Sequence, residues 1–364
     1  MNLSLVNSMT SISAMNSERP KMHGGRLLEF SKSGKKYIDF SASINPYGID
    51  PKLKDILKKS IDILVHYPNQ DYSEIKALIS RKHDVSEDSI YLGNGANSII
   101  FRLFGIFDRK LNICIPTPSF ESYRLAAESV SGHIIYYNMY KFKITNDIFD
   151  ILSDNIDILV LTNPNNPTGY LIDEELLQGL LEYCKAKNIF VLLDECFLEF
   201  VEDGEKYSQI SNLSKYNNLV ILRSLTKLYA FPGLRFGYLL TENKKIMEDL
   251  NKLTPSWDIN TLALEAAKFS LTQDMSQVVL KIQKEKSILL KNLKSVGIEV
   301  FDSKANFLLC RYKKNLSNAL LNDGIIVRDC SDFRGMDNTY FRVSVKTNSE
   351  NMILFENIKK LIGR

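Results

Sequence analysis

Residues 219–237 read LVILRSLTKLYAFPGLRFG, and this stretch decides the fold. An apolar run at 219–222 leads into a polar turn that ends on Lys227, and a second apolar run at 236–240 follows a Pro-Gly pair. Short apolar runs bounded by turn residues are typical of strands that are buried on both faces. The stretch therefore predicts two buried strands whose connection carries Lys227 and Arg235.

The same pattern recurs upstream, in apolar runs at 89–92, 111–115, 158–162 and 189–193. Residues 172–187 separate two of these runs and place four leucines at helical spacing behind an acidic first turn. Alternating strands and helices predict parallel strands, because a right-handed crossover returns the chain to the same edge of the sheet. We expect an α/β fold with a mostly parallel, doubly wound sheet.

The pattern of apolar segments changes after residue 260. A long helical stretch at 261–293 precedes three short apolar segments that resemble strands, at 307–310, 325–328 and 339–345. The segment at 27–40 could pair with them. We expect a small α+β domain built from both ends of the chain and a large domain between them. The expected boundaries are 1–22 for an extension, 46–260 for the large domain, and 23–45 with 261–364 for the small domain.

Charge and composition exclude several classes of protein. The 364 residues include 46 Lys and Arg against 43 Asp and Glu, interspersed along the chain. This balance gives no reason to expect a nucleic-acid or membrane-surface partner. No apolar run reaches the roughly 20 residues of a membrane span, and residues 1–21 lack the apolar core of a signal peptide.

The cysteines and histidines suggest neither a metal site nor a disulfide framework. Five widely spaced cysteines form no Cys-x-x-Cys pair, and the four histidines show no metal-ligand spacing. An odd number of unpaired cysteines is typical of a reducing compartment. We expect a cytoplasmic protein without a metal.

Polar residues directly follow several predicted strands. The turn NPNNPTG at 163–169 follows one strand, Asp194 follows another, and the turn ending on Lys227 follows a third. Parallel strands bring their carboxyl ends to one edge, where ligands of doubly wound folds bind. A buried aspartate is costly unless a cation pairs with it. Residues 93–97, GNGAN, open a helix, and free N–H groups at a helix start suit a phosphate.

Together, and in this order, these motifs resemble the pyridoxal 5′-phosphate (PLP) enzymes of fold type I, the aspartate-aminotransferase superfamily. The resemblance runs from about His23 to the C-terminus. It implies that Lys227 is the lysine that forms a Schiff base with PLP. It also implies that Asp194 lies beside the pyridine nitrogen and that Asn166 donates to the phenolic oxygen. A lysine suits this role because burial readily makes its amine nucleophilic.

The resemblance assigns further residues to the cofactor. Phe120 matches an aromatic side chain that stacks on the ring. Tyr67 matches a tyrosine that reaches the phosphate of the neighbouring subunit, which implies a homodimer. The residues implied to hold the phosphate within one chain are Gly95, Ala96, Asn97, Ser224 and Arg235.

Two arginines match positions that bind substrate anions. Arg342 matches the arginine that holds the substrate carboxylate, and Arg328 lies where relatives acting on phosphorylated amines hold an anion. The planar guanidinium group suits such oxyanions because it can bind them bidentately. His23 and Asn45 complete the set of residues that we expect to contact substrate.

The chain is most similar to the branch that contains L-threonine-O-3-phosphate decarboxylase and histidinol-phosphate aminotransferase. Four stretches resemble the decarboxylase, and Phe197 stands where most aminotransferases have a tyrosine. These stretches lie at 23–25, 39–46, 224–235 and 328–335. The resemblance implies decarboxylation of a phosphorylated small amino acid, most simply L-threonine O-3-phosphate to aminopropanol phosphate in cobalamin biosynthesis.

Two departures from the pattern leave alternatives open. Ser43 stands where asparagine is expected, and Ala96-Asn97 replaces a stretch that usually includes an acidic residue. The alternatives are decarboxylation of phosphoserine or phosphonoalanine and transamination of the histidinol-phosphate type. Some transcription regulators also carry this fold, but the residues before His23 are too few for their DNA-binding region.

Overall fold

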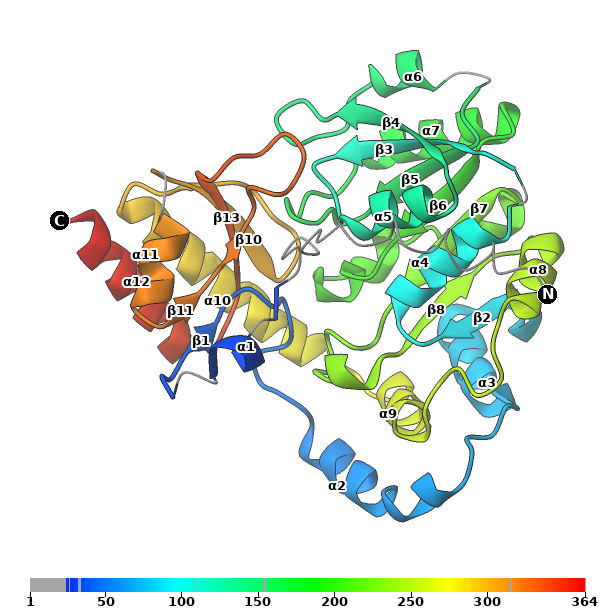
Figure 1. Cartoon of the computed structure of the whole chain (residues 1–364), viewed down its shortest axis with the longest axis horizontal. Helices are drawn as coiled ribbons and strands as arrows, with labels where there is room; N and C mark the ends of the chain where they lie inside the picture. Colours follow the sequence, from blue (N-terminus) through cyan, green and yellow to red (C-terminus); the bar gives the residue numbers. More distant parts are fainter. Residues whose placement is uncertain are drawn as a thin grey trace, which may run out of the picture.

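Seven strands form the central sheet in the order β2-β8-β7-β6-β5-β3-β4 (Figure 1). The structure is a computed structural model and describes residues 24–25, 27–31, 34–107, 109–152, 155–313 and 316–363. In sheet order the strands are β2 (Ile90–Gly93), β8 (Gly237–Leu240), β7 (Leu219–Arg223), β6 (Phe190–Asp194), β5 (Ile158–Thr162), β3 (Asn112–Thr117) and β4 (His133–Asn138). All run in the same direction except β8, which is antiparallel to both of its neighbours.

The sheet confirms the predicted α/β class and the mostly parallel topology. The six predicted runs are all strands, but the expectation that the run at 236–240 is parallel was wrong. An apolar four-residue strand reads the same in either direction, and its connection to β7, residues 224–236, is long enough for a crossover, so the sequence did not indicate the reversal. The sequence analysis also missed β4, an edge strand whose side chains are only partly buried.

Helices cover both faces of the sheet. One face carries α4 (Ala96–Gly105), α5 (Ser122–Ser129) and α8 (Lys244–Lys252), whose apolar side chains share a core with alternate strand residues such as Val160 and Leu192. The other face carries α3 (Ser73–His83), α6 (Ile148–Ile151), α7 (Glu174–Ala186) and α9 (Thr261–Leu271), packed on residues such as Leu161 and Leu193. Asp173 caps α7 by accepting hydrogen bonds from its first backbone amides.

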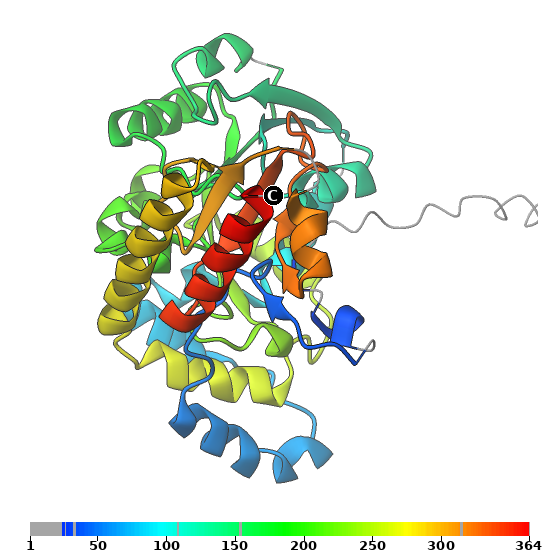
Figure 2. The same cartoon turned by 90° about the vertical axis from the view of Figure 1, so that its left-hand side faces the viewer.

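A second, smaller sheet lies beside the first (Figures 1 and 2). It has the order β12-β13-β10-β9, is antiparallel, and comes from the C-terminal part of the chain. A separate two-stranded sheet joins both ends of the chain: β1 (Ile38–Asp39) pairs with β11 (Ile325–Ile326), as the sequence suggested for the segment at 27–40. The other elements are α1 (Leu27–Ser31), α10 (Ser276–Ser295), β9 (Glu299–Val300), β10 (Phe307–Arg311), α11 (Leu316–Asn322), β12 (Arg328–Asp329), β13 (Tyr340–Ser344) and α12 (Asn348–Ile362).

This smaller part has its own apolar core, in which Phe40 packs with residues of α10, β10, β13 and α12. The domain boundaries themselves stay a prediction. The predicted helical stretch at 261–293 consists of two helices, because α9 ends at Leu271 and α10 begins at Ser276. Between them, Asp274 accepts hydrogen bonds from the backbone amide and the hydroxyl of Ser276.

One segment projects from the rest of the molecule. The helix α2 (Pro51–Lys59) and a 3₁₀ turn at Asp62–Val65 form an arm that contacts α9 (Figures 1 and 2). Most apolar side chains of the turn are exposed. Among the described residues, every helix is too short or too polar to cross a lipid bilayer.

Candidate active site

A pocket of about 330 Å³ lies between the carboxyl ends of the large sheet and the smaller sheet. We call its two sides the large-sheet wall and the small-sheet wall. The large-sheet wall includes Ala96, Asn97, Phe120, Tyr123, Thr162, Asn166, Asp194, Cys196, Phe197, Ser224, Thr226, Lys227 and Arg235. The small-sheet wall includes Arg328, Phe333 and Arg342, together with residues 41–44. Ten of the predicted site residues therefore line one pocket.

Asp194 is held by two donors at the end of β6. Its Oδ1 accepts from the backbone amide of Cys196 at 2.8 Å, and its Oδ2 accepts from the hydroxyl of Tyr123 at 2.6 Å. The side chain of Asp194 is almost fully buried. Burial and the neighbouring carboxylate raise the pKa of Tyr123 well above its usual range, so its hydroxyl remains a donor. The two bonds fix the carboxylate in the pocket.

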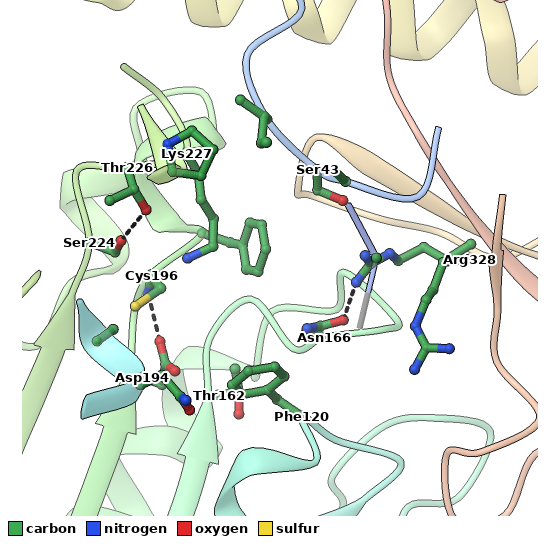
Figure 3. A pocket seen from close by; sticks show the side chains of 18 of the residues that line it. Ser43, Phe120, Thr162, Asn166, Asp194, Cys196, Ser224, Thr226, Lys227 and Arg328 are labelled. Atoms are coloured by element: carbon green, nitrogen blue, oxygen red, sulfur yellow. Dashed lines mark hydrogen bonds between the residues drawn. The ribbon is translucent and has the colours of Figure 1, made fainter. Parts of the chain in front are cut away.

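Lys227 reaches into the same pocket from the connection that follows β7. Figure 3 shows its side chain on the same side as Asp194 and Cys196. The Nζ atom lies 4.7 Å from the centroid of the Phe197 ring. Asn45 does not line the pocket, although we expected it to contact substrate. Its backbone amide donates to the carbonyl of Lys227 at 3.0 Å, and its side chain donates to the carbonyl of Leu228 at 2.9 Å.

The start of α4 forms a cradle beside Arg235. Gly95 caps the helix with φ of 84°, a conformation that favours glycine, and any Cβ there would lie 2.5 Å from the Arg235 guanidinium. The backbone amides of Ala96 and Asn97 belong to the first helical turn and have no intrahelical acceptor. The predicted Ser224 and the unpredicted Thr226 add two hydroxyls, 2.9 Å apart. Such a set of donors fits a phosphate group.

Arg342 crosses from β13 of the smaller sheet to the large-sheet wall. Its Nη1 donates to Oδ1 of Asn166, and its Nη2 donates to the carbonyl of Ser41 at 3.0 Å. Its Nε has no hydrogen-bond partner among the described residues. Burial lowers the pKa of Arg342 to about 10, so the group remains charged near neutral pH. The guanidinium therefore offers positive charge and an unused donor to the pocket.

Arg328 lies beyond Asn166 on the opposite side of the pocket from Lys227 (Figure 3). Both carboxylate oxygens of Asp332 lie 2.8 Å from its Nη2, and its Nη1 donates to the carbonyl of Asp329. Phe333 packs against the guanidinium, with its ring centroid 5.0 Å from the central carbon. The sequence analysis predicted the arginine and missed the aspartate that pairs with it.

Tyr67 does not line the pocket of its own chain. It lies on the arm with 77% of its surface exposed, and its ring stacks on Trp257 with centroids 4.4 Å apart. His23 lies outside the described residues. In the part of the chain that the structure describes, no three His, Cys, Asp or Glu side chains come together as a metal site would require.

The residues of the pocket fit PLP. The cradle at α4 offers amide donors, hydroxyls and the Arg235 guanidinium to a phosphate, and a Cβ at Gly95 would fill it. Asp194 presents a fixed carboxylate to the same pocket, and a protonated ring nitrogen can pair with it. Phe120 supplies an aromatic surface, and Lys227 an amine. This set of groups can hold a cofactor that stabilises a carbanion.

Comparisons with known proteins identify the family. The family model described as aminotransferase class I and II matches residues 35–358. A threonine-phosphate decarboxylase of Salmonella typhimurium is 31% identical over 354 residues, which are 93% of this chain and 96% of that protein.

Two solved structures share the fold. The histidinol-phosphate aminotransferase from Clostridium acetobutylicum gives a TM-score of 0.83 at 30% identity, over 89% of this chain and 98% of that one. The L-threonine-O-3-phosphate decarboxylase from Porphyromonas gingivalis gives 0.80 at 26%, over 89% and 99%. These findings confirm the resemblance that the motifs indicated: the chain belongs to the class I and II aminotransferase family, and its cofactor is pyridoxal 5′-phosphate.

Proposed function

We propose that this enzyme decarboxylates a phosphorylated small amino acid, with L-threonine O-3-phosphate as the first candidate and aminopropanol phosphate as the product. The observation that carries the proposal is the pair of buried arginines, Arg328 and Arg342, in one pocket with Lys227 and Asp194. A phosphorylated amino acid has two anionic groups and needs two such partners. The pathway would be cobalamin biosynthesis.

The large-sheet wall would bind and orient PLP. The phosphate would lie at the start of α4, against Ser224, Thr226 and Arg235, and Asp194 would pair with the pyridine nitrogen. PLP supplies an electron sink for the α-carbon of the substrate. Asn166, whose Oδ1 accepts from Arg342, would donate its amide to the phenolic oxygen.

Lys227 would act as the acid and base of the reaction. When carbon dioxide leaves, its bonding electrons stay with the α-carbon, and the Nζ of Lys227 would return a proton to that atom. Phe197 lies against this Nζ and has no hydroxyl to donate. The tyrosine of most aminotransferases at this position donates to the phenolic oxygen, so its absence supports the decarboxylase branch.

The test is product analysis without any keto acid. PLP-loaded protein incubated with L-threonine O-3-phosphate should release carbon dioxide and form aminopropanol phosphate, both followed by NMR. Transamination that depends on glutamate, with no carbon dioxide formed, would overturn the proposal in favour of the histidinol-phosphate type. Unchanged substrate would reject this amino acid and direct the same assay to phosphoserine and phosphonoalanine.

We also propose that the active unit is a homodimer in which Tyr67 reaches the phosphate of the partner's cofactor. An exposed apolar patch supports this, because solvent-exposed patches of this kind mark interfaces. The patch consists of Ile61, Ile63, Leu64, Val65 and Tyr67, in the arm and directly after it, and of Trp257, on which Tyr67 stacks.

Sedimentation velocity tests the dimer. The protein should sediment as a dimer, and Val65→Asp should shift it towards the monomer. Tyr67→Phe should stay dimeric and raise the Kd for PLP about tenfold, because a hydrogen bond to a charged group is lost. A monomer at all concentrations, or a Tyr67→Phe variant with unchanged PLP affinity, would refute the proposal.

A further inference from the structure

Arg328 is held on both of its terminal nitrogens by its own chain. Nη2 lies 2.8 Å from each carboxylate oxygen of Asp332, and Nη1 donates to the carbonyl of Asp329. The guanidinium lines the pocket, and only 7% of the residue is exposed. An anion that binds Nη2 therefore competes with Asp332 for this nitrogen.

We propose that Asp332 is an internal competitor for the anionic group of the substrate. Its carboxylate occupies the part of Arg328 that the substrate needs, and binding exchanges one anion for the other. The inference rests on the proposed function in one respect, since it takes Arg328 as a residue that binds a substrate anion.

Burial explains why Arg328 has a resident partner. A buried guanidinium without a counter-ion is costly, because its charge loses hydration. The Asp332 side chain is 30% exposed, so its carboxylate borders on solvent and can return to water when an anion replaces it. The exchange keeps the arginine paired before and after binding.

The backbone around Asp332 is fixed, so the exchange requires only rotation of its side chain. Turn hydrogen bonds join Phe333 to Cys330 and Met336 to Phe333, each at 3.0 Å. The Arg334 guanidinium lies 4.0 Å from the centroid of the Tyr136 ring and so connects this loop to β4 of the large sheet. The loop that carries the competitor is thus anchored on both sides of the pocket.

Competition of this kind lowers the affinity of every anion by the same factor. The apparent Kd of a ligand equals its intrinsic Kd divided by the fraction of Arg328 that Asp332 does not occupy. A ligand carboxylate has the same charge and the same number of acceptor oxygens as the Asp332 carboxylate that it replaces. A phosphate dianion brings a second charge and more acceptor oxygens. The competitor would therefore leave phosphorylated compounds bound at concentrations at which simple carboxylates are excluded.

Calorimetric titration of the PLP-loaded enzyme tests the proposal with two probes, n-propyl phosphate and butyrate. Asp332→Asn should lower the Kd of both probes about tenfold, which leaves their ratio unchanged. Asp332→Glu should behave like the wild type, because the charge is kept. Asp332→Ser should match Asp332→Asn and replaces it if the amide variant does not fold.

The matched control is Asp329→Asn. It removes a carboxylate one residue from Arg328 that caps a turn at Ser331, and asparagine can keep that bond. The Kd of both probes should stay within about twofold, since the carbonyl that Arg328 uses belongs to the backbone. An equal fall in Kd for this variant would show that the local field is responsible, and the proposal would fail.

Two other results would overturn the inference. A higher Kd in Asp332→Asn would mean that Asp332 positions Arg328 for binding, and an unchanged Kd would mean that the two anions do not compete. The binding assay does not depend on turnover. If threonine phosphate is not decarboxylated but the tenfold gain in affinity appears, the proposed function fails and the inference stands. If threonine phosphate is decarboxylated but the affinity does not change, the proposed function stands and the inference fails.

Discussion

On the large-sheet wall, Asp194 is held by a backbone amide and a buried hydroxyl, whereas on the small-sheet wall Arg342 is held by two carbonyl oxygens and Arg328 by a carboxylate. The first set of partners is built into strand ends and a helix. The second set consists of acceptors for which an incoming anion can substitute, because charged acceptors bind guanidinium more strongly than neutral ones.

The difference separates two tasks within one pocket. A wall with fixed donors suits a cofactor that stays bound, and a wall with replaceable acceptors suits a substrate that comes and goes. Substitutions on the large-sheet wall should therefore change the chemistry and the absorbance of the bound cofactor. Substitutions on the small-sheet wall should change substrate affinity and leave the cofactor spectrum intact.

Lys227→Ala should have the largest effect. We expect turnover to fall by at least about 10⁴-fold, because the nucleophile and the acid-base group are lost together. The absorbance of covalently held PLP should disappear while circular dichroism stays unchanged. Lys244→Ala, at the exposed start of α8, serves as a control with normal turnover. Normal turnover in Lys227→Ala would mean that the lysine has been misassigned.

Asp194→Asn should lower kcat by about 10³-fold, because the charge that stabilises the cofactor ring is removed. The cofactor should still bind, and its spectrum should shift. The neighbouring Glu195 gives a matched control, because it is equally buried but pairs with Arg223 at 2.8 Å outside the pocket. Glu195→Gln should lower Tm and spare kcat. Similar kcat losses in both variants would remove the distinction between the chemical and the structural carboxylate.

Arg342→Lys should reduce kcat/KM by about 10²-fold, mainly through KM, because lysine cannot reproduce the bidentate grip on an oxyanion. The spectrum of bound PLP should stay as in the wild type. This result would support the separate roles of the two walls, since the substitution keeps the positive charge and changes only the small-sheet wall. A shifted spectrum with an unchanged KM would assign Arg342 to the cofactor.

Tyr123→Phe should have the smallest effect, a fall in kcat of about tenfold, because Asp194 loses one of two donors. Tyr140→Phe removes a hydroxyl from an exposed tyrosine and should change nothing. If Tyr123→Phe raises KM for substrate without changing kcat, Tyr123 would act on the substrate side and the division between the walls would be less sharp.

Most of the large sheet could be predicted from its apolar runs, because two-sided burial leaves a clear signal. The direction of β8 could not be predicted, because a pattern of apolar residues does not show which way a strand runs. The edge strand β4 gave a weak signal since only Tyr137 of its six residues is fully buried. At the break between α9 and α10, Asp274 accepts local hydrogen bonds from Ser276, which the spacing of apolar residues does not reveal.

Within the site, motif order predicted which side chains come together, but not what each one contacts. Lys227, Asp194 and Asn166 follow strands and therefore reach the same edge. Tyr123 was read only as part of a motif, and its contact with Asp194 depends on how α5 packs against β6, which the motif does not show. Asp332 lies in a loop four residues after Arg328. Outside a helix, this spacing does not predict that two side chains are in contact. Asn45 was expected at the substrate and instead supports the backbone beside the lysine.

The reversed direction of β8 has a mechanical consequence. Because β8 turns back at the pocket edge, Lys227 and Arg235 both lie in one hairpin-like connection, residues 224–236, and not in two separate strand-helix units. A parallel strand would have begun at the far edge of the sheet and would have taken Arg235 away from the pocket. The two proposed attachment points for opposite ends of the cofactor therefore share one connection. A displacement of this connection would shift both points together and would move both ends of the cofactor at once.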